Sequence, residues 1–164
     1  MGAGKTSVGA ELAHRLGWQF RDLDDLIEAR AGITIPEIFS LQGEVAFRQA
    51  EAVTLTEFLS STRQTSVILA LGGGAFAQDA NREALRRAHA RIVLLTAPVA
   101  ELWHRCSTLD KKVRPLLGDE KSFQQLFSER LPAYQRADLT VSTEQKSVSQ
   151  VATEIESSLA LVSR

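Results

Sequence analysis

The chain has 164 residues, of which 44% are hydrophobic and 24% charged, so it is long enough for one domain with a single core. Its 19 basic and 20 acidic residues give a net charge of -1 without charge runs, which argues against binding to nucleic acid or a membrane surface. No stretch approaches the roughly 20 apolar residues of a membrane span, and no signal-peptide pattern opens the chain. We expect a cytoplasmic monomer.

The first residues carry half of a phosphate-binding loop. The sequence GAGKT at residues 2–6 is the second half of G-x-x-x-x-G-K-[ST], and a helical pattern of apolar residues follows it. Backbone N–H groups, the helix N-terminus and the Lys5 ammonium would together hold a polyphosphate. The opening glycine would lie two positions before Met1, so we expect an upstream extension of about 8–15 residues that forms a short apolar strand and ends in this glycine. Without it we expect the chain to be insoluble or inactive.

Helical and strand patterns then alternate along the chain. Strands are predicted at 18–23, 67–71, 92–95 and 139–141. Helices are predicted behind the phosphate loop up to Gly17 and at 24–31, 34–41, 44–60, 81–88, 99–106, 123–131 and 148–161. This alternation is typical of an α/β fold, in which helices cover both faces of a parallel sheet and ligands bind at the carboxyl ends of the strands.

Two acidic residues follow the first predicted strand. Asp22 and Asp24 are two positions apart, so in extended chain they would project to the same side, beside the phosphate loop. One carboxylate could hold Mg²⁺ together with the Thr6 hydroxyl, and the other could orient or deprotonate an attacking hydroxyl group. The alternative is structural, with Asp24 capping the next helix and Asp22 facing solvent.

The predicted helix 44–60 carries charge on its apolar face. At 100° per residue, Glu44, Arg48 and Glu51 fall within the arc of the large apolar side chains. An internal ion pair between Arg48 and Glu51 would explain this placement. A substrate carboxylate gripped by the free edge of the guanidinium would explain it equally, and the two interpretations are compatible.

A glycine triplet directly follows the predicted strand 67–71. Glycines at Gly72, Gly73 and Gly74 have no packing value of their own. They are expected where the backbone takes unusual dihedrals or a ligand approaches closely, with a plain turn as the alternative.

Two arginines complete the candidate set. Arg130 shares a helical face with aromatic residues, so it is a second guanidinium directed inward, although Pro132 is expected to kink or restart that helix. Arg114 lies in the polar segment 108–121, which could form a cationic lid over a triphosphate or a solvated loop.

Taken together, these motifs resemble the shikimate kinase family. The matching stretches are MGAGKT, FRDLDDLIE running into AGITIPEIF, GEVAFRQAE, LGGG, RPLL, and RLPAY followed by ADLTV. They occur in the family's order and span nearly the whole chain. The resemblance implies a P-loop NTPase fold of the nucleoside-monophosphate-kinase-like type, a three-layer α/β/α arrangement. Its parallel sheet has the order 2-3-1-4-5, and the first strand is absent from this chain.

The resemblance also implies the activity, which is transfer of the γ-phosphoryl group of ATP to the 3-hydroxyl of shikimate in aromatic amino acid biosynthesis. Implied catalytic residues are Lys5, Asp24 and Arg114, and Mg²⁺ is implied at Thr6 and Asp22. Shikimate is implied to contact Asp24, Arg48, Gly72, Gly73, Gly74 and Arg130. Implied ATP contacts are Gly2, Ala3, Gly4, Lys5, Thr6, Ser7, Arg114 and either Lys146 or Gln145.

Two alternatives remain from the sequence. A kinase of another small hydroxy acid could share the loop and the acid pair. A non-catalytic ligand-sensing domain of similar fold is the other, although such a domain is expected to have lost the loop lysine, an acid or the lid arginine, all of which are present.

Overall fold

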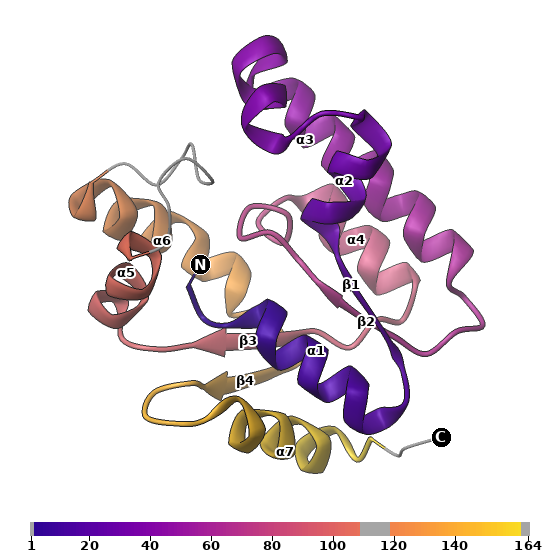
Figure 1. Ribbon diagram of the computed structural model, residues 1–164, viewed down its shortest axis with the longest axis vertical. Coiled ribbons are helices and arrows are strands. Elements are labelled where there is room, and N and C mark those ends of the chain that lie inside the picture. The colour runs from indigo at the N-terminus through magenta and orange to yellow at the C-terminus, as the bar shows by residue number, and fades with distance from the viewer. Residues whose placement is uncertain (1, 109–118, 162–164) are drawn as a thin grey trace.

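A computed structural model describes residues 2–108 and 119–161. Helices and strands alternate in these residues, which confirms the predicted α/β class (Figure 1). The element order is α1 (Lys5–Leu16), β1 (Gln19–Asp22), α2 (Leu23–Ala31), α3 (Ile35–Ser61), β2 (Val67–Ala70), α4 (Asp79–Arg87), β3 (Val93–Thr96), α5 (Val99–Ser107), α6 (Glu120–Tyr134), β4 (Leu139–Ser142) and α7 (Val148–Leu159). No helix in the described ranges is long and apolar enough to cross a membrane.

The strands form two separate parallel pairs. β1 pairs with β2, with Gln19 opposite Val67, and β3 pairs with β4, with Val93 opposite Leu139. In the part of the chain that the structure describes, no ladder joins β2 to β3. The implied order 2-3-1-4-5 gives the same two pairs when its first strand is left out.

A cavity of about 400 Å³ lies between the two sheets. Its walls come from β2, β3 and α1, and most of the side chains that line it are aliphatic, among them Leu12, Ile68 and Leu95. The core is therefore divided rather than continuous across the sheets.

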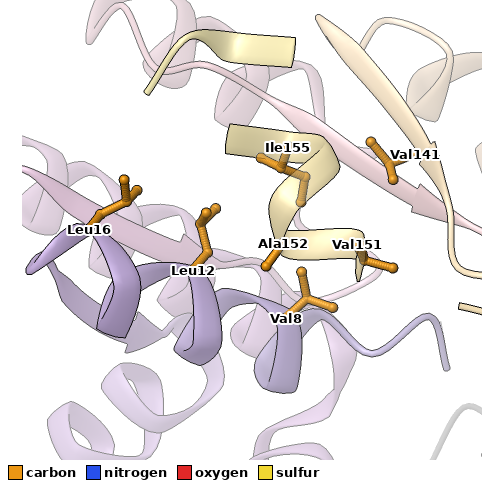
Figure 2. Close-up of a cluster of buried hydrophobic side chains, with 7 residues drawn as sticks. All are labelled: Val8, Leu12, Leu16, Val141, Val151, Ala152 and Ile155. Carbon is orange, nitrogen blue, oxygen red and sulfur yellow. The ribbon is translucent and has the colours of Figure 1, made fainter. Parts of the chain in front are cut away.

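One part of the core joins the first and last helices. Val8, Leu12 and Leu16 of α1 meet Val151 and Ile155 of α7, and Val141 of β4 belongs to the same cluster (Figure 2). A second cluster joins α2, α3 and α4 around residues such as Ile27, Phe47 and Leu85.

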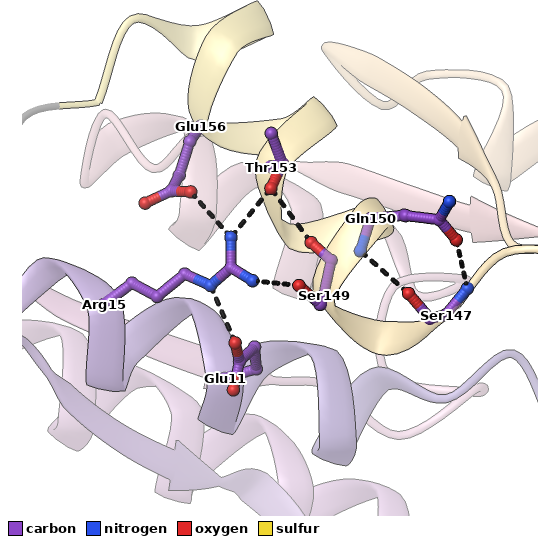
Figure 3. Close-up of polar contacts among 7 residues, drawn as sticks. All are labelled: Glu11, Arg15, Ser147, Ser149, Gln150, Thr153 and Glu156. Atoms are coloured by element: carbon purple, nitrogen blue, oxygen red, sulfur yellow. Dashed lines mark hydrogen bonds and ion pairs between the residues drawn. The ribbon is translucent and has the colours of Figure 1, made fainter.

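Arg15 adds a polar connection between α1 and α7 (Figure 3). Its Nε donates to Glu11 at 2.7 Å, and its Nη2 donates to Ser149 at 2.6 Å. Its Nη1 donates to Thr153 at 2.8 Å and to Glu156 at 3.3 Å. The helix that follows the phosphate loop is thus held to the C-terminal helix by packing and by a multiply bonded guanidinium.

The long helix α3 contains a break. Thr34 caps it in a capping box with Glu37, as the sequence pattern indicates. Gly43 has φ 79° and ψ 176°, which are not helical, and this residue separates the two predicted helices 34–41 and 44–60. Only glycine adopts such dihedrals at low cost, so the bend is encoded at that position.

Several predicted boundaries differ from the structure by a few residues, and two of these differences affect candidate site residues. β1 ends at Asp22 and α2 begins at Leu23, one residue earlier than predicted. α6 does not stop at Leu131 but continues through Pro132 to Tyr134, so the helical phase is kept past the proline. This continuation places Tyr134 one turn beyond Arg130 on the same helix face.

Candidate active site

The phosphate loop leads into α1 through two left-handed residues. Gly2 has φ 66° and Gly4 has φ 79°, and α1 begins directly after Gly4. A Cβ on Gly2 would lie 2.7 Å from the Leu102 carbonyl oxygen and 2.8 Å from the Cys106 sulfur, so no side chain fits there. The first N–H groups of a helix have no acceptor within the helix, and they carry the positive end of its dipole. This end of α1 is suited to bind an anion.

Thr6 and Asp22 meet beside that helix end. The Thr6 hydroxyl donates to Asp22 Oδ2 at 3.0 Å. Asp22 is also the N-cap of α2, because its Oδ1 accepts the Asp24 N–H at 3.1 Å. The predicted extended geometry of the acid pair is therefore wrong, as is the alternative with Asp24 as the cap. Asp24 comes next to Asp22 because it stands in the first turn of a helix.

Arg48 is held by two carboxylates of its own helix. Its Nη1 donates to Glu51 Oε2 at 3.0 Å, while its Nε and Nη2 donate to Glu44 Oε1 at 3.3 Å and 3.2 Å. The expected internal pair with Glu51 is confirmed. The expected free edge is wrong in this structure, because Glu44 occupies it, and the Glu44 side chain is 53% exposed.

Glu51 is the buried centre of this charge cluster, with 1% of its surface exposed. Its Oε2 accepts from Arg48 and from the Gln78 amide. Burial raises the pKa of the Glu51 carboxyl, the Arg48 charge opposes that rise, and Asp24 and Arg130 act on the same pKa with smaller effects of opposite sign. The two acids and two arginines are therefore close enough to interact electrostatically.

The glycine triplet packs against these charged groups. A Cβ on Gly72 would lie 3.0 Å from Asp24 Oδ1 and 3.4 Å from Glu51 Oε1, and a Cβ on Gly74 would lie 2.7 Å from Arg48 Cζ. None of the three glycines has a left-handed φ, so the explanation by unusual dihedrals is wrong. The glycines are required because side chains of the protein itself approach the backbone closely. The segment also forms a turn, in which the Ala75 N–H donates to the Gly72 carbonyl at 3.1 Å.

Tyr134 closes the site from α6. Its hydroxyl donates to the Gly73 carbonyl oxygen at 2.6 Å, and the side chain is buried. Burial raises the pKa of the Tyr134 hydroxyl, and the nearby charges of Arg130 and Arg48 oppose that rise. The inward direction predicted for Arg130 is thereby supported, since it acts on both Tyr134 and Glu51.

The remaining predicted residues lie elsewhere. Lys146 follows β4 and its Nζ pairs with Glu154 of α7 at 2.6 Å. Arg114 and most of the segment 108–121 lie outside the described residues. Sequence reasoning did not single out Arg105, whose Nη1 donates to Thr143 Oγ1 at 2.9 Å beside the β4–α7 loop. It also did not single out Gln78, for which no motif gave a signal.

The contacts link these groups in a spatial order from one end of the site to the other. The loop helix and Thr6 reach Asp22, and Asp22 holds the α2 turn that carries Asp24. Asp24 faces Gly72 and Glu51, and Glu51 binds Arg48. The arrangement can hold an anion at the helix end and a carboxylate at the arginines, with a carboxylate of its own between them.

The comparisons with known sequences agree on one family. The family model described as "Shikimate kinase" matches residues 1–160. A shikimate kinase of Chromobacterium violaceum is 40% identical over 152 residues, which cover 90% of this chain and 79% of the relative. One of Halorhodospira halophila is 44% identical over 147 residues, which cover 87% of this chain and 80% of the relative.

Solved structures give the same result. The shikimate kinase of Acinetobacter baumannii in complex with shikimate matches with a TM-score of 0.88 and 41% identity, over 98% of this chain and 89% of that one. A gluconokinase of Sinorhizobium meliloti, at 18% identity and a TM-score of 0.59, shares the fold alone. With the sequence model, the relatives and the ligand-bound structure in agreement, the chain belongs to the shikimate kinase family.

Proposed function

We propose that this member of the family transfers the γ-phosphoryl group of ATP to the 3-hydroxyl group of shikimate. ATP-dependent phosphorylation of shikimate is the activity of the family to which the chain belongs. The observation that best supports phosphoryl transfer to a hydroxyl of a carboxylate substrate is the position of Asp24. Asp24 lies between a helix end suited to bind an anion and the two arginines Arg48 and Arg130.

The proposed carboxylate site consists of Arg48 and Arg130. A guanidinium binds a carboxylate through two parallel hydrogen bonds, and Glu51 holds Arg48 in place from the buried side. Because the Glu44 carboxylate already bonds Nε and Nη2, an incoming carboxylate would exchange with it rather than fill an empty position. Exposure of Glu44 makes this exchange feasible, since the displaced side chain is hydrated at once.

At the opposite end we propose that the backbone of residues 2–7, the Lys5 ammonium and Arg114 bind the phosphates, with Lys146 toward the adenine. We propose Mg²⁺ at Thr6 and Asp22, whose hydroxyl and carboxylate oxygens lie 3.0 Å apart. These hard oxygen donors suit a cation that takes few protein ligands and completes its shell with water and phosphate oxygens. Bound Mg²⁺ would neutralise charge on the phosphates.

In the proposed reaction Asp24 orients the attacking hydroxyl and accepts its proton. Lys5 stabilises the charge on the transferring phosphoryl group, and Arg114 adds charge from the lid. Gly72, Gly73 and Gly74 present a backbone surface to shikimate without side chains in its way.

The test is ADP release, with ATP, Mg²⁺ and either shikimate or gluconate, by protein purified together with any in-frame residues encoded before Met1. Shikimate-dependent release with none from gluconate supports the proposal. Release from gluconate alone would indicate another hydroxy-acid kinase, and shikimate binding without release would indicate a sensing domain. Omitting Mg²⁺ should abolish release, and light scattering should show the monomer we propose.

A further inference from the structure

The hydroxyl of Tyr134 is a buried polar group that the proposed reaction does not use. Tyr134 is 7% exposed and is the single tyrosine of the chain. Its hydroxyl donates to the carbonyl oxygen of Gly73 at 2.6 Å, across 61 positions in sequence. A short hydrogen bond from a buried donor fixes the two partners relative to each other, because no water can replace either of them at low cost.

Gly73 stands between two glycines that touch the proposed shikimate-binding groups. Gly72 faces Asp24 Oδ1, and Gly74 faces the guanidinium of Arg48. A displacement of the Gly73 carbonyl would therefore move the backbone against which both side chains are positioned.

The same hydroxyl also interacts with Arg130. Arg130 acts on the pKa of Tyr134 through its charge and through a side-chain hydrogen bond, and it precedes Tyr134 by one helical turn. Tyr134 thus interacts with Arg130 of its own helix on one side and with the glycine turn on the other.

We infer that Tyr134 is a positioning residue that sets the separation between Arg130 and the glycine turn, and so fits the site to shikimate. This inference rests on the proposed function of that site. It assigns Tyr134 no contact with substrate; the hydroxyl acts through the Gly73 carbonyl and through Arg130.

The remainder of the turn is held by other side chains. Asn81 Nδ2 donates to the Ala75 carbonyl at 3.0 Å, and Arg82 Nη1 donates to the Phe76 carbonyl at 2.8 Å. Loss of the tyrosine hydroxyl should therefore loosen the Gly73 end of the turn without unfolding it. The effect on the enzyme should appear on one substrate only.

The first experiment is Tyr134→Phe, which removes the hydroxyl and keeps the ring. We expect the KM for shikimate to rise about 3- to 10-fold, as for one lost hydrogen bond, with the KM for ATP within about 2-fold of wild type. Ser128→Ala is the matched control, because it removes an exposed hydroxyl from the same helix, and both KM values should stay unchanged. Equal rises in the two KM values, or no rise in either, would overturn the inference.

The second experiment needs no substitution. Because Tyr134 is the single tyrosine, biosynthetic labelling with 3-fluorotyrosine gives one ¹⁹F resonance. Saturating shikimate should shift this resonance, and a non-hydrolysable ATP analogue alone should not. If shikimate leaves the chemical shift of this resonance unchanged, although the protein phosphorylates shikimate, the role of Tyr134 is refuted and the proposed function stands. Absence of shikimate-dependent ADP release by the wild type would instead refute the proposed function.

Discussion

Gly74→Ala tests the geometry of the candidate site with one added methyl group. The backbone of Gly74 is not left-handed, so alanine is accepted there without backbone strain. Its Cβ, however, would lie 2.7 Å from Arg48 Cζ, whereas ordinary contact begins at 3.4 Å. Nη1 and Nη2 of Arg48 would lie closer still, so the guanidinium must retreat by at least about 0.7 Å. Displacement of a binding group by about 1 Å can cost about 100-fold in rate.

We expect the kcat/KM for shikimate to fall about 10- to 100-fold in Gly74→Ala, with the KM for ATP nearly unchanged. Steady-state ADP release at varied shikimate and at varied ATP measures the two effects separately. Gly72→Ala serves as a graded comparison, because its Cβ would lie 3.0 Å from Asp24 Oδ1 and the required movement is smaller.

A double-mutant cycle decides whether the methyl acts through Arg48. In the Arg48→Ala background there is no guanidinium to displace, so adding Gly74→Ala should change kcat/KM by less than about 2-fold. If Gly74→Ala reduces activity by the same factor in both backgrounds, the steric reasoning is refuted and the glycine acts through something else.

Three further predictions follow from the same groups. Arg48→Ala or Arg130→Ala should raise the KM for shikimate far more than that for ATP, at a cost of about 2–5 kcal/mol in binding, and normal shikimate binding by both would contradict the carboxylate site. Asp24→Asn should abolish turnover with ATP binding nearly intact, whereas Lys5→Ala should weaken both turnover and ATP binding. Isothermal titration measures the ATP affinity of each variant, and ADP release measures its turnover. Burial raises the pKa of Glu51 above 4.5, so the unfolded chain loses this proton at lower pH than the folded chain, and stability should fall as pH rises through that window. Denaturant titrations of Glu51→Gln should lack this decrease, and an identical pH dependence would contradict it.

Patterns of single elements could be read from the sequence. The two halves of α3, on either side of Gly43, match the helices predicted at 34–41 and 44–60, and the pairing of Arg48 with Glu51 followed from their spacing on an inward face. Both depend on local geometry, which helical periodicity describes well. The parallel direction of the strand pairs was confirmed for a related reason, because connections through helices between strands give parallel neighbours. Which strands pair was implied by the family resemblance and not by the pattern of elements.

Contacts between distant elements could not be read in this way. Gln78 donates to Glu51 and Tyr134 donates to Gly73, and both contacts depend on packing across the fold. Glu44 bonds the outer edge of Arg48 within one helix, but that contact depends on a side-chain rotamer, which periodicity does not predict. The structural alternative named Asp24 instead of Asp22 as the cap of α2, because a shift in the predicted start of a helix exchanges the roles of neighbouring acids. Tyr134 also lay beyond the expected end of its helix, since proline usually interrupts one.

The separation of the two sheets bears on how the molecule opens. β2, α2 and α3 contribute to one core cluster, while β3, β4, α1 and α7 contribute to another, against which Ile68 of β2 also packs. In the described residues no strand ladder joins the two sheets. Opening of one half therefore does not require breaking strand hydrogen bonds of the other, and amide protons of the two halves should exchange with different free energies. Arg48 belongs to the first half and the phosphate-loop helix to the second. Shikimate and ATP bound together would span both halves, so the pair of ligands should merge the two exchange units into one.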